Sequence, residues 1–176
     1  YDDYWKKRNA LSYLKDIKHP ILNVAGWFDA EDFYGPMEIY YTIERETPKN
    51  QNLLVVGPWR HGGWASGKGD SLGDIRFDSN TAETYRQEIE FPFFQHHLKG
   101  KGDPKLPEAI VFETGSNRWN RFDDWPPKNV VPRNLYLREG QRLSFTAPAK
   151  KQGFDSFLSD PQKPVPFSAE IRNTQG

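Results

Sequence analysis

Three carboxylates follow a short apolar segment near the start of the chain. Residues 21–26 read Ile-Leu-Asn-Val-Ala-Gly, and Asp29, Glu31 and Asp32 come directly after them. An apolar run of this length, entered through His-Pro, predicts a buried strand. Acidic side chains are rarely buried without partners, but the strand ends of an open α/β sheet face the crevice where such folds bind ligands. The three carboxylates are therefore candidates for chemistry.

A histidine follows a second strand of the same design. Residues 53–57 are apolar and end in glycine, and His61 comes four residues later, before two further glycines. Between the strands, residues 35–47 have a proline in the first turn and apolar residues at helical spacing, which predicts a crossover helix. A strand–helix–strand unit places its two strands parallel and adjacent. Asp29 and His61 are therefore expected at the same edge of the sheet.

An aspartate followed by a histidine matches the last two members of the Ser, Asp, His triad of an α/β hydrolase. The aspartate would hold the imidazole in one tautomer, and the histidine would take the proton from the serine. The ordinary alternative is that Asp29 caps a helix or forms a turn and that His61 is a loop residue. Spacing alone leaves both interpretations open.

The chain resembles the superfamily of cocaine esterase, X-prolyl dipeptidyl aminopeptidases and α-amino acid ester hydrolases, which includes cephalosporin-acylase-like members. The resemblance runs from about Tyr4 to Leu143 and rests on four motifs: Gly26-Trp27-Phe28-Asp29, Gly57-Pro58-Trp59-Arg60-His61, Phe93-Phe94 and His97-Leu98-Lys99-Gly100.

This resemblance implies roles for several residues. The aspartate and histidine that close the first two motifs are triad members in the family, which implies that role for Asp29 and His61. In the α-amino acid ester hydrolase branch, the carboxylates two and three places after the aspartate help to bind the substrate ammonium. That implies a substrate-binding role for Glu31 and Asp32. We add Trp27 and Trp64 as substrate-binding candidates. Trp64 could line the acyl pocket.

The chain has no Gly-x-Ser-x-Gly motif, in which the nucleophile of an α/β hydrolase would lie. Together with this absence, the resemblance implies the carboxy-terminal part of a β-lactam acylase-like serine hydrolase that cleaves esters or amides of α-amino acids. This segment would be inactive alone. One alternative is a general esterase or acylase of the same fold, in which Glu31 and Asp32 cap the next helix. Another is a non-catalytic jelly-roll module that binds sugar or protein.

The expected fold class is α/β, followed by a β-sandwich. Residues 1–104 are expected to be the C-terminal part of an α/β-hydrolase domain, and residues 105–176 the start of a jelly roll. The second part carries four predicted strands, at residues 109–114, 117–121, 133–137 and 142–145.

Two further segments of the first part have distinct patterns. The glycine-rich residues 62–79 are expected to form a mobile surface loop. Residues 80–97 are predicted to form an amphipathic helix that packs on the sheet. The helix should begin with a capping box of Asn80 and Glu83 and be kinked by Pro92.

Composition excludes several partners. The chain has 24 basic and 24 acidic residues, which gives no electrostatic case for nucleic acid or an anionic membrane surface. No apolar run approaches the length of a membrane span. There is no cysteine, and the neighbouring His96 and His97 point to different faces of a helix, so we expect no metal and no cofactor.

The remaining expectations concern substrate, assembly and compartment. The expected ligand is a small acyl substrate. An incomplete parallel sheet would expose apolar edges, which predicts poor solubility or association, including a homo-oligomer. The compartment stays open, and a periplasmic or secreted protein is expected only if a signal peptide lies upstream.

Overall fold

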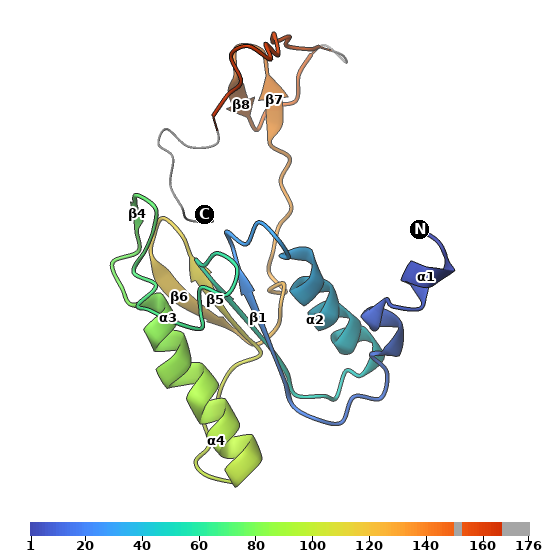
Figure 1. Ribbon diagram of the computed structural model, residues 1–176, viewed down its shortest axis with the longest axis vertical. Coiled ribbons are helices and arrows are strands. Elements are labelled where there is room, and N and C mark those ends of the chain that lie inside the picture. The colour runs from blue at the N-terminus through green and yellow to red at the C-terminus, as the bar shows by residue number, and fades with distance from the viewer. Residues whose placement is uncertain (150–152, 167–176) are drawn as a thin grey trace. The chain divides into compact units, whose positions relative to one another are not determined.

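The computed structural model describes residues 1–149 and 153–166, and its contacts divide the chain after Lys128 into two units. The first unit is built on a four-stranded mixed sheet, part of which is labelled in Figure 1. The strands are ordered β1-β2-β5-β6, with β1 parallel to β2, β2 parallel to β5, and β6 antiparallel to β5. The four strands are β1 (Ile21–Gly26), β2 (Asn52–Gly57), β5 (Ala109–Glu113) and β6 (Arg118–Phe122).

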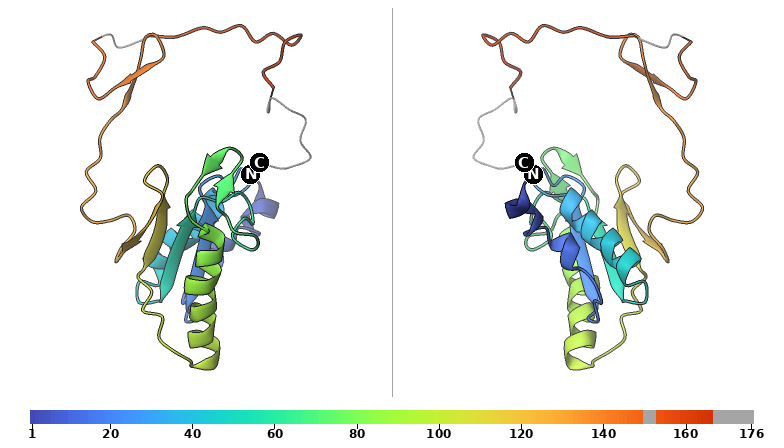
Figure 2. Two further views of the ribbon diagram at one scale, coloured as in Figure 1. Left: turned by 90° about the vertical axis from the view of Figure 1, so that its left-hand side faces the viewer. Right: turned by 90° about the vertical axis from the view of Figure 1, so that its right-hand side faces the viewer.

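Helices cover both faces of this sheet (Figure 2). One face carries α2 (Tyr34–Glu46), the predicted crossover helix between β1 and β2. The other carries a continuous helix of α3 (Thr81–Thr84), a π-helical turn η2 (Tyr85–Glu90) and α4 (Phe91–Lys99). The strand–helix–strand unit expected from the sequence is therefore confirmed.

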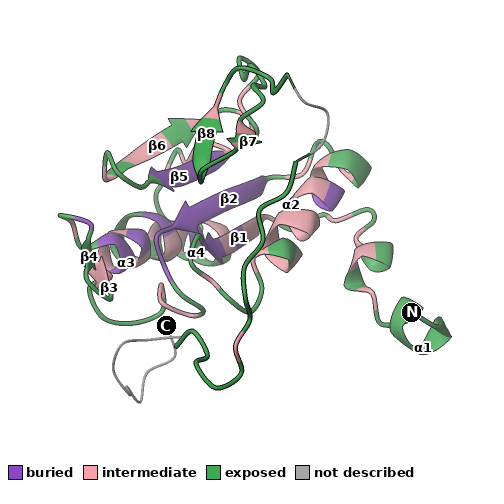
Figure 3. Ribbon diagram, turned by 90° about the horizontal axis from the view of Figure 1, so that it is seen from above, coloured by how far each residue is buried: buried purple, intermediate pink, exposed green. Residues whose placement is uncertain are grey.

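The strands are apolar because both of their faces are covered. Leu54 and Val56 pack in the same cluster as Tyr40 of α2, whereas Val55 packs with Tyr85 and Ile89 of η2. All six residues of β2 are buried, which is visible as the continuous buried strand in Figure 3. Burial on two faces explains why β2 reads as a continuous apolar run rather than an alternating one.

The continuous helix of α3, η2 and α4 differs in detail from the helix predicted for residues 80–97. The helix passes Pro92 with the π-helical turn η2 immediately before it, in which the Phe91 N–H donates to the Arg86 carbonyl. A proline lacks the N–H that would bond four residues back, so a widened turn is one way for a helix to accommodate it. The capping box was wrong, because the Asn80 side chain bonds the Glu83 carboxylate rather than a backbone N–H.

Smaller elements complete the first unit. α1 (Asp3–Lys6) and η1 (Ala10–Tyr13), a single 3-10 turn, precede β1, and β3 (Ser71–Leu72) pairs with β4 (Ile75–Arg76) in a short hairpin. In the described part of the chain, no helix has both the length and the apolar character needed to cross a membrane.

The division between the units differs from the expected boundary at residues 104 and 105. β5 and β6 belong to the same sheet as β1 and β2, with Val55 opposite Ile110 across the β2–β5 pair. The Gly-Lys-Gly-Asp-Pro segment ends α4, after which the chain returns to the sheet. The change of pattern therefore marks the end of a helix, and the contacts divide only after Lys128.

The second unit contains an antiparallel hairpin of β7 (Tyr136–Arg138) and β8 (Arg142–Ser144). β8 lies within the predicted segment 142–145, whereas β7 begins inside the predicted segment 133–137 and ends one residue beyond it. Several of its apolar side chains are exposed, including Leu137 and Phe154. The jelly roll stays a prediction, and its residues 150–152 and 167–176 lie outside the described residues.

Candidate active site

Asp29 lies in a tight turn at the carboxyl end of β1. The Phe28 N–H donates to the Trp59 carbonyl at 3.1 Å, which holds the segment after β1 against the segment after β2. One carboxylate oxygen of Asp29, Oδ1, accepts from the N–H groups of Glu31 (2.9 Å) and Asp32 (3.1 Å). The ordinary role considered for Asp29, turn formation, is thus present and uses only this oxygen.

The second oxygen of Asp29 faces His61. Nδ1 of His61 lies 2.9 Å from Oδ2 of Asp29. The side chain of Asp29 is only 3% exposed, whereas that of His61 is 55% exposed. A proton on Nδ1 that is held by this carboxylate leaves Nε2, on the opposite side of the ring, as the basic nitrogen. The pair therefore has the geometry of a buried acid that orients an accessible base.

Trp59 brings the two segments together, and the sequence analysis assigned it no role. Its side chain is 2% exposed, and its Nε1–H donates to Oγ1 of Thr81 at 2.9 Å. A Cβ on Gly26 would lie 2.2 Å from the Trp59 carbonyl oxygen, and one on Gly57 would lie 2.4 Å from its ring. Both motif glycines are thus required by close approach to one tryptophan. The glycine that ends each strand shortly before a tryptophan, Gly26-Trp27 and Gly57-Pro58-Trp59, is the signal that could have indicated this, but it does not reveal Thr81.

The two carboxylates after Asp29 have different surroundings. Asp32 accepts from the Gly35 N–H at 2.7 Å through Oδ1, so it caps the first turn of α2. Glu31 is exposed, and its backbone N–H donates to the Asp29 carboxylate. The helix-cap alternative therefore describes Asp32, while the carboxylate of Glu31 is open to solvent.

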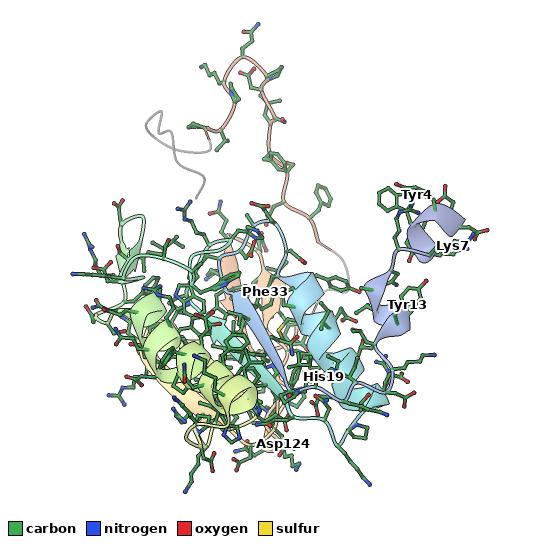
Figure 4. All side chains as sticks on the ribbon, turned by 60° about the horizontal axis from the view of Figure 1, so that its bottom comes forward. Tyr4, Lys7, Tyr13, His19, Phe33 and Asp124 are labelled. Carbon is green, nitrogen blue, oxygen red and sulfur yellow. The ribbon has the colours of Figure 1, made fainter. Side chains whose placement is uncertain are left out.

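The two tryptophans predicted to bind substrate, Trp27 and Trp64, lie in different places: Trp27 over β5 and β6, and Trp64 beside His61. Trp27 donates from Nε1 to the Phe112 carbonyl at 2.7 Å and packs on Phe33 at 5.3 Å between ring centroids. It lines an open cavity of about 360 Å³ over β5 and β6. Phe33, on which Trp27 packs, is labelled in Figure 4 near the carboxyl end of β1, and His19 is labelled at the opposite end. Its hydrogen bond to the Phe112 carbonyl thus fixes Trp27 to β5.

Trp64 lies beside the histidine. Its ring centroid is 6.4 Å from that of His61 and 6.2 Å from that of Trp59. Residues 62–69, expected as part of a mobile loop, make hydrogen bonds to α3 and η2, including one from the Ala82 N–H to the Lys68 carbonyl at 2.9 Å. The structure thus brings Asp29, His61 and Trp64 together and directs Trp27 elsewhere.

The pKa values of the pair shift in opposite directions. Burial opposes ionisation of Asp29, but the N–H groups of Asp32 and Glu31 and the contact with His61 outweigh it and lower the pKa of Asp29. The hydrogen bond to Asp29 and its charge raise the pKa of His61, and the charge of Glu31 adds to the effect. Each member thus favours the charged form of the other.

Known proteins share this arrangement of elements. A family model of the X-Pro dipeptidyl-peptidases (S15 family) matches residues 1–63, which include Asp29 and His61. The solved structure of an aminopeptidase from the marine sediment archaeon Thaumarchaeota archaeon superposes with a TM-score of 0.84 at 37% identity, over 96% of this chain and 28% of that one. An α-amino acid ester hydrolase superposes with a TM-score of 0.83 at 33% identity, over 95% of this chain and 29% of that one.

The chain belongs to the superfamily of S15 peptidases and α-amino acid ester hydrolases. This confirms the family predicted from the motifs, and the mixed α/β fold of the chain agrees with it. It spans less than a third of the length of the two solved structures. No curated protein matches it.

The adjacent histidines His96 and His97 lie on α4. His97 packs on the ring of Phe93 at 4.5 Å between centroids, and Nδ1 of His96 lies 2.6 Å from the Gly102 carbonyl. Burial, and secondarily the charge of His96, lower the pKa of His97. Across residues 1–149 and 153–166, no cluster of three or more histidine and acidic side chains is arranged to hold a metal.

We expect the His61 pKa, measured by NMR titration of its ring protons, to lie above the ordinary value of 6.5. Because folding raises this pKa, the pair stabilises the fold below pH 6.5, and the contribution is lost as the pH rises through the raised value. Asp29→Asn should move the His61 pKa down towards 6.5. His97 serves as the internal reference, because its pKa should stay low in both proteins. An unchanged His61 titration in Asp29→Asn would contradict the pairing.

Proposed function

We propose that this chain supplies the acid and the base of the catalytic triad of a serine hydrolase that cleaves esters or amides of α-amino acids. The observation that carries the proposal is the contact between a nearly buried Asp29 oxygen and Nδ1 of an exposed His61, at the ends of two adjacent parallel strands. Ser-His-Asp hydrolases of the α/β class use the same chain order of acid and base.

In the proposed reaction, Nε2 of His61 takes the proton of a serine hydroxyl as the serine attacks the ester or amide carbonyl. His61 then gives this proton to the leaving alcohol or amine. Asp29 keeps the other ring nitrogen protonated and stabilises the imidazolium. Because the chain has no Gly-x-Ser-x-Gly motif, the proposal places the nucleophile outside these 176 residues. Water hydrolyses the acyl-enzyme with the same histidine as base.

Glu31 is proposed to bind the free α-ammonium of the substrate, with Asp32 contributing negative charge. The support is the exposure of Glu31 beside the pair and the electrostatic effect of Glu31 and Asp32 on His61. An ammonium next to the scissile carbonyl would lie near these anions and be stabilised by them. A small, positively charged acyl group is therefore the proposed substrate class.

A general esterase or acylase of the same fold is the second candidate. The helix cap made by Asp32 favours it, because one carboxylate of the cluster already has a structural role. In that case the acyl group would be neutral, since an anionic one would be repelled by Glu31.

The exposed apolar side chains of the second unit support a further proposal about the fold. We propose that its β7–β8 hairpin belongs to the start of a jelly-roll sandwich, whose inner face would cover side chains such as Leu137 and Leu143. Uncovered, such side chains favour association.

The substrate proposal is tested in the full-length protein with one aromatic amino acid ester, with its amine either free or acetylated. We expect a strong preference for the free amine in kcat/KM. Glu31→Gln should reduce this preference by about tenfold or more, because a charged hydrogen bond contributes ~1.5–3 kcal/mol.

The matched control is Asp32→Asn, which removes a charge from the same cluster but keeps an oxygen for the Gly35 N–H. It should reduce the preference less than Glu31→Gln does. Equal rates on the two esters would leave the triad in place and favour the general esterase.

A further inference from the structure

The segment that follows His61 is tied at its far end to the start of a helix. The Lys68 carbonyl accepts from the Ala82 N–H at 2.9 Å, and the Gly69 carbonyl accepts from the Thr81 hydroxyl at 2.6 Å. Gly69 has a positive φ of 68°, and a Cβ there would lie 2.7 Å from Ala82. Residues 62–69 therefore run from the histidine to a fixed point on α3.

Arg86 of the π-helical turn η2 holds the middle of this segment. Its Nη1 donates to the Trp64 carbonyl at 2.9 Å, and its Nη2 donates to the Gly67 carbonyl at 2.6 Å. A guanidinium has a planar fork of donors, so it can bond two acceptors at a fixed separation, which an ammonium cannot do in the same geometry. Arg86 thus fixes the positions of two backbone groups that lie three residues apart.

The direction of the Arg86 side chain is set by its neighbours in the helix. Tyr85 and Ile89 are buried against the sheet, and the Tyr85 ring packs on Trp59 at 5.4 Å. The π-helical turn begins at Tyr85, and such turns occur as single insertions in helices, frequently at functional sites. The same helix that anchors Trp59 therefore directs Arg86 at the segment carrying Trp64.

We propose that Arg86 is a positioning residue that holds Trp64 as a fixed wall beside His61, so that Trp64 selects acyl groups by size. The inference rests on the proposed function and extends it to substrate selection. Its structural basis is that Trp64 contacts both His61 and Trp59 while its own carbonyl is bonded by Arg86. Released from Arg86, the Trp64 ring would no longer have one position relative to the reacting carbonyl.

The test compares kcat/KM of the full-length protein for a phenylalanine ester and an alanine ester. The parent should discriminate between them, and Arg86→Met should move their ratio towards one by about tenfold, because displacements of about 1 Å near a reacting group carry penalties of this order or larger. Arg86→Lys can bond only one carbonyl well and should lie between the two. Gln87→Met changes the exposed neighbouring residue to the same side chain and should leave the ratio unchanged.

A double mutant decides whether Arg86 acts through Trp64. If it does, Arg86→Met should change the ester ratio little in a Trp64→Ala background, so the two effects are not additive. Equal loss of activity on both esters, or additive effects, would show a merely structural role and overturn the inference. A parent that does not discriminate between the esters would overturn it as well.

Two NMR readouts do not depend on turnover. Arg86→Met should shift the His61 ring protons, because the Trp64 ring moves, and should speed exchange of the Ala65 amide, which bonds the Gly62 carbonyl. The His61 pKa should stay raised, because its contact with Asp29 is unaffected. If the full-length protein hydrolyses neither ester, the proposed function fails, while these readouts still show whether Arg86 holds Trp64. Unchanged shifts and exchange would refute that hold.

Discussion

Replacing His61 with glutamine in the full-length protein is expected to lower kcat on the order of 10⁵-fold or more. Loss of the histidine from a Ser-His-Asp triad removes the base for attack and the acid for departure of the leaving group, and the members of a triad act as a unit. Glutamine has a similar size and is polar, so the exposed position should accept it without loss of the fold. Single-turnover hydrolysis of an amino acid ester, with circular dichroism to verify folding, measures the effect.

His19→Gln is the matched control for this variant. His19 lies at the other end of β1, and it accepts a hydrogen bond from Asn50 through its backbone carbonyl, which the substitution keeps. Its activity should equal that of the parent. A His61→Gln protein with activity within tenfold of the parent would remove His61 from the chemistry and leave the contact with Asp29 as structural.

Gly26→Ala is expected to destabilise the protein by about 3 kcal/mol or more, since inserting atoms into a close-packed contact typically costs 1–3 kcal/mol and more where backbone must move. The added Cβ would lie 2.2 Å from the carbonyl oxygen of Trp59 and 2.9 Å from its carbonyl carbon. Neither group is the end of a flexible side chain, so the segments after β1 and β2 must separate. The hydrogen bond from Phe28 to Trp59 should then weaken or break.

Urea unfolding of the variant and parent, read by tryptophan fluorescence, measures this loss. Gly153→Ala makes the same substitution where a Cβ would meet open space, and it should change the free energy of unfolding by less than about 0.5 kcal/mol. A Gly26→Ala protein as stable as the Gly153→Ala protein would mean that the contact relaxes without cost. Activity should fall in Gly26→Ala, because Asp29 and His61 would move apart.

The sequence predicted the parts of the site that local pattern determines. Two apolar runs joined by a helix form adjacent parallel strands in few ways, so the nearness of Asp29 and His61 followed from their places after those runs. The sequence also indicated that Asp32 could cap the next helix, because the cap and the capped N–H are three residues apart. Such relations extend over one turn or one crossover.

Longer-range relations were not predictable in the same way. β5 joins β2 across more than fifty residues, and neither strand carries a signal that names its partner. The bonds of Trp59 to Thr81 and of Arg86 to Trp64 link residues about twenty apart through packed helices. Pro92 signalled a disturbance of its helix, but the register that points Arg86 at the loop depends on the packing of Tyr85 and Ile89. Tertiary packing, rather than local propensity, sets these positions.

The shared carboxylate of Asp29 has an evolutionary consequence. One oxygen closes the turn and the other orders the proton on His61, so a substitution must preserve both oxygens to keep both tasks. Asparagine could keep the turn, but its amide would donate to Nδ1 and leave the proton on Nε2, which reverses the polarity of the base. Glutamate would shift both oxygens by one methylene. We therefore expect aspartate to be invariant at position 29 among active descendants, while position 31 can vary as substrates change.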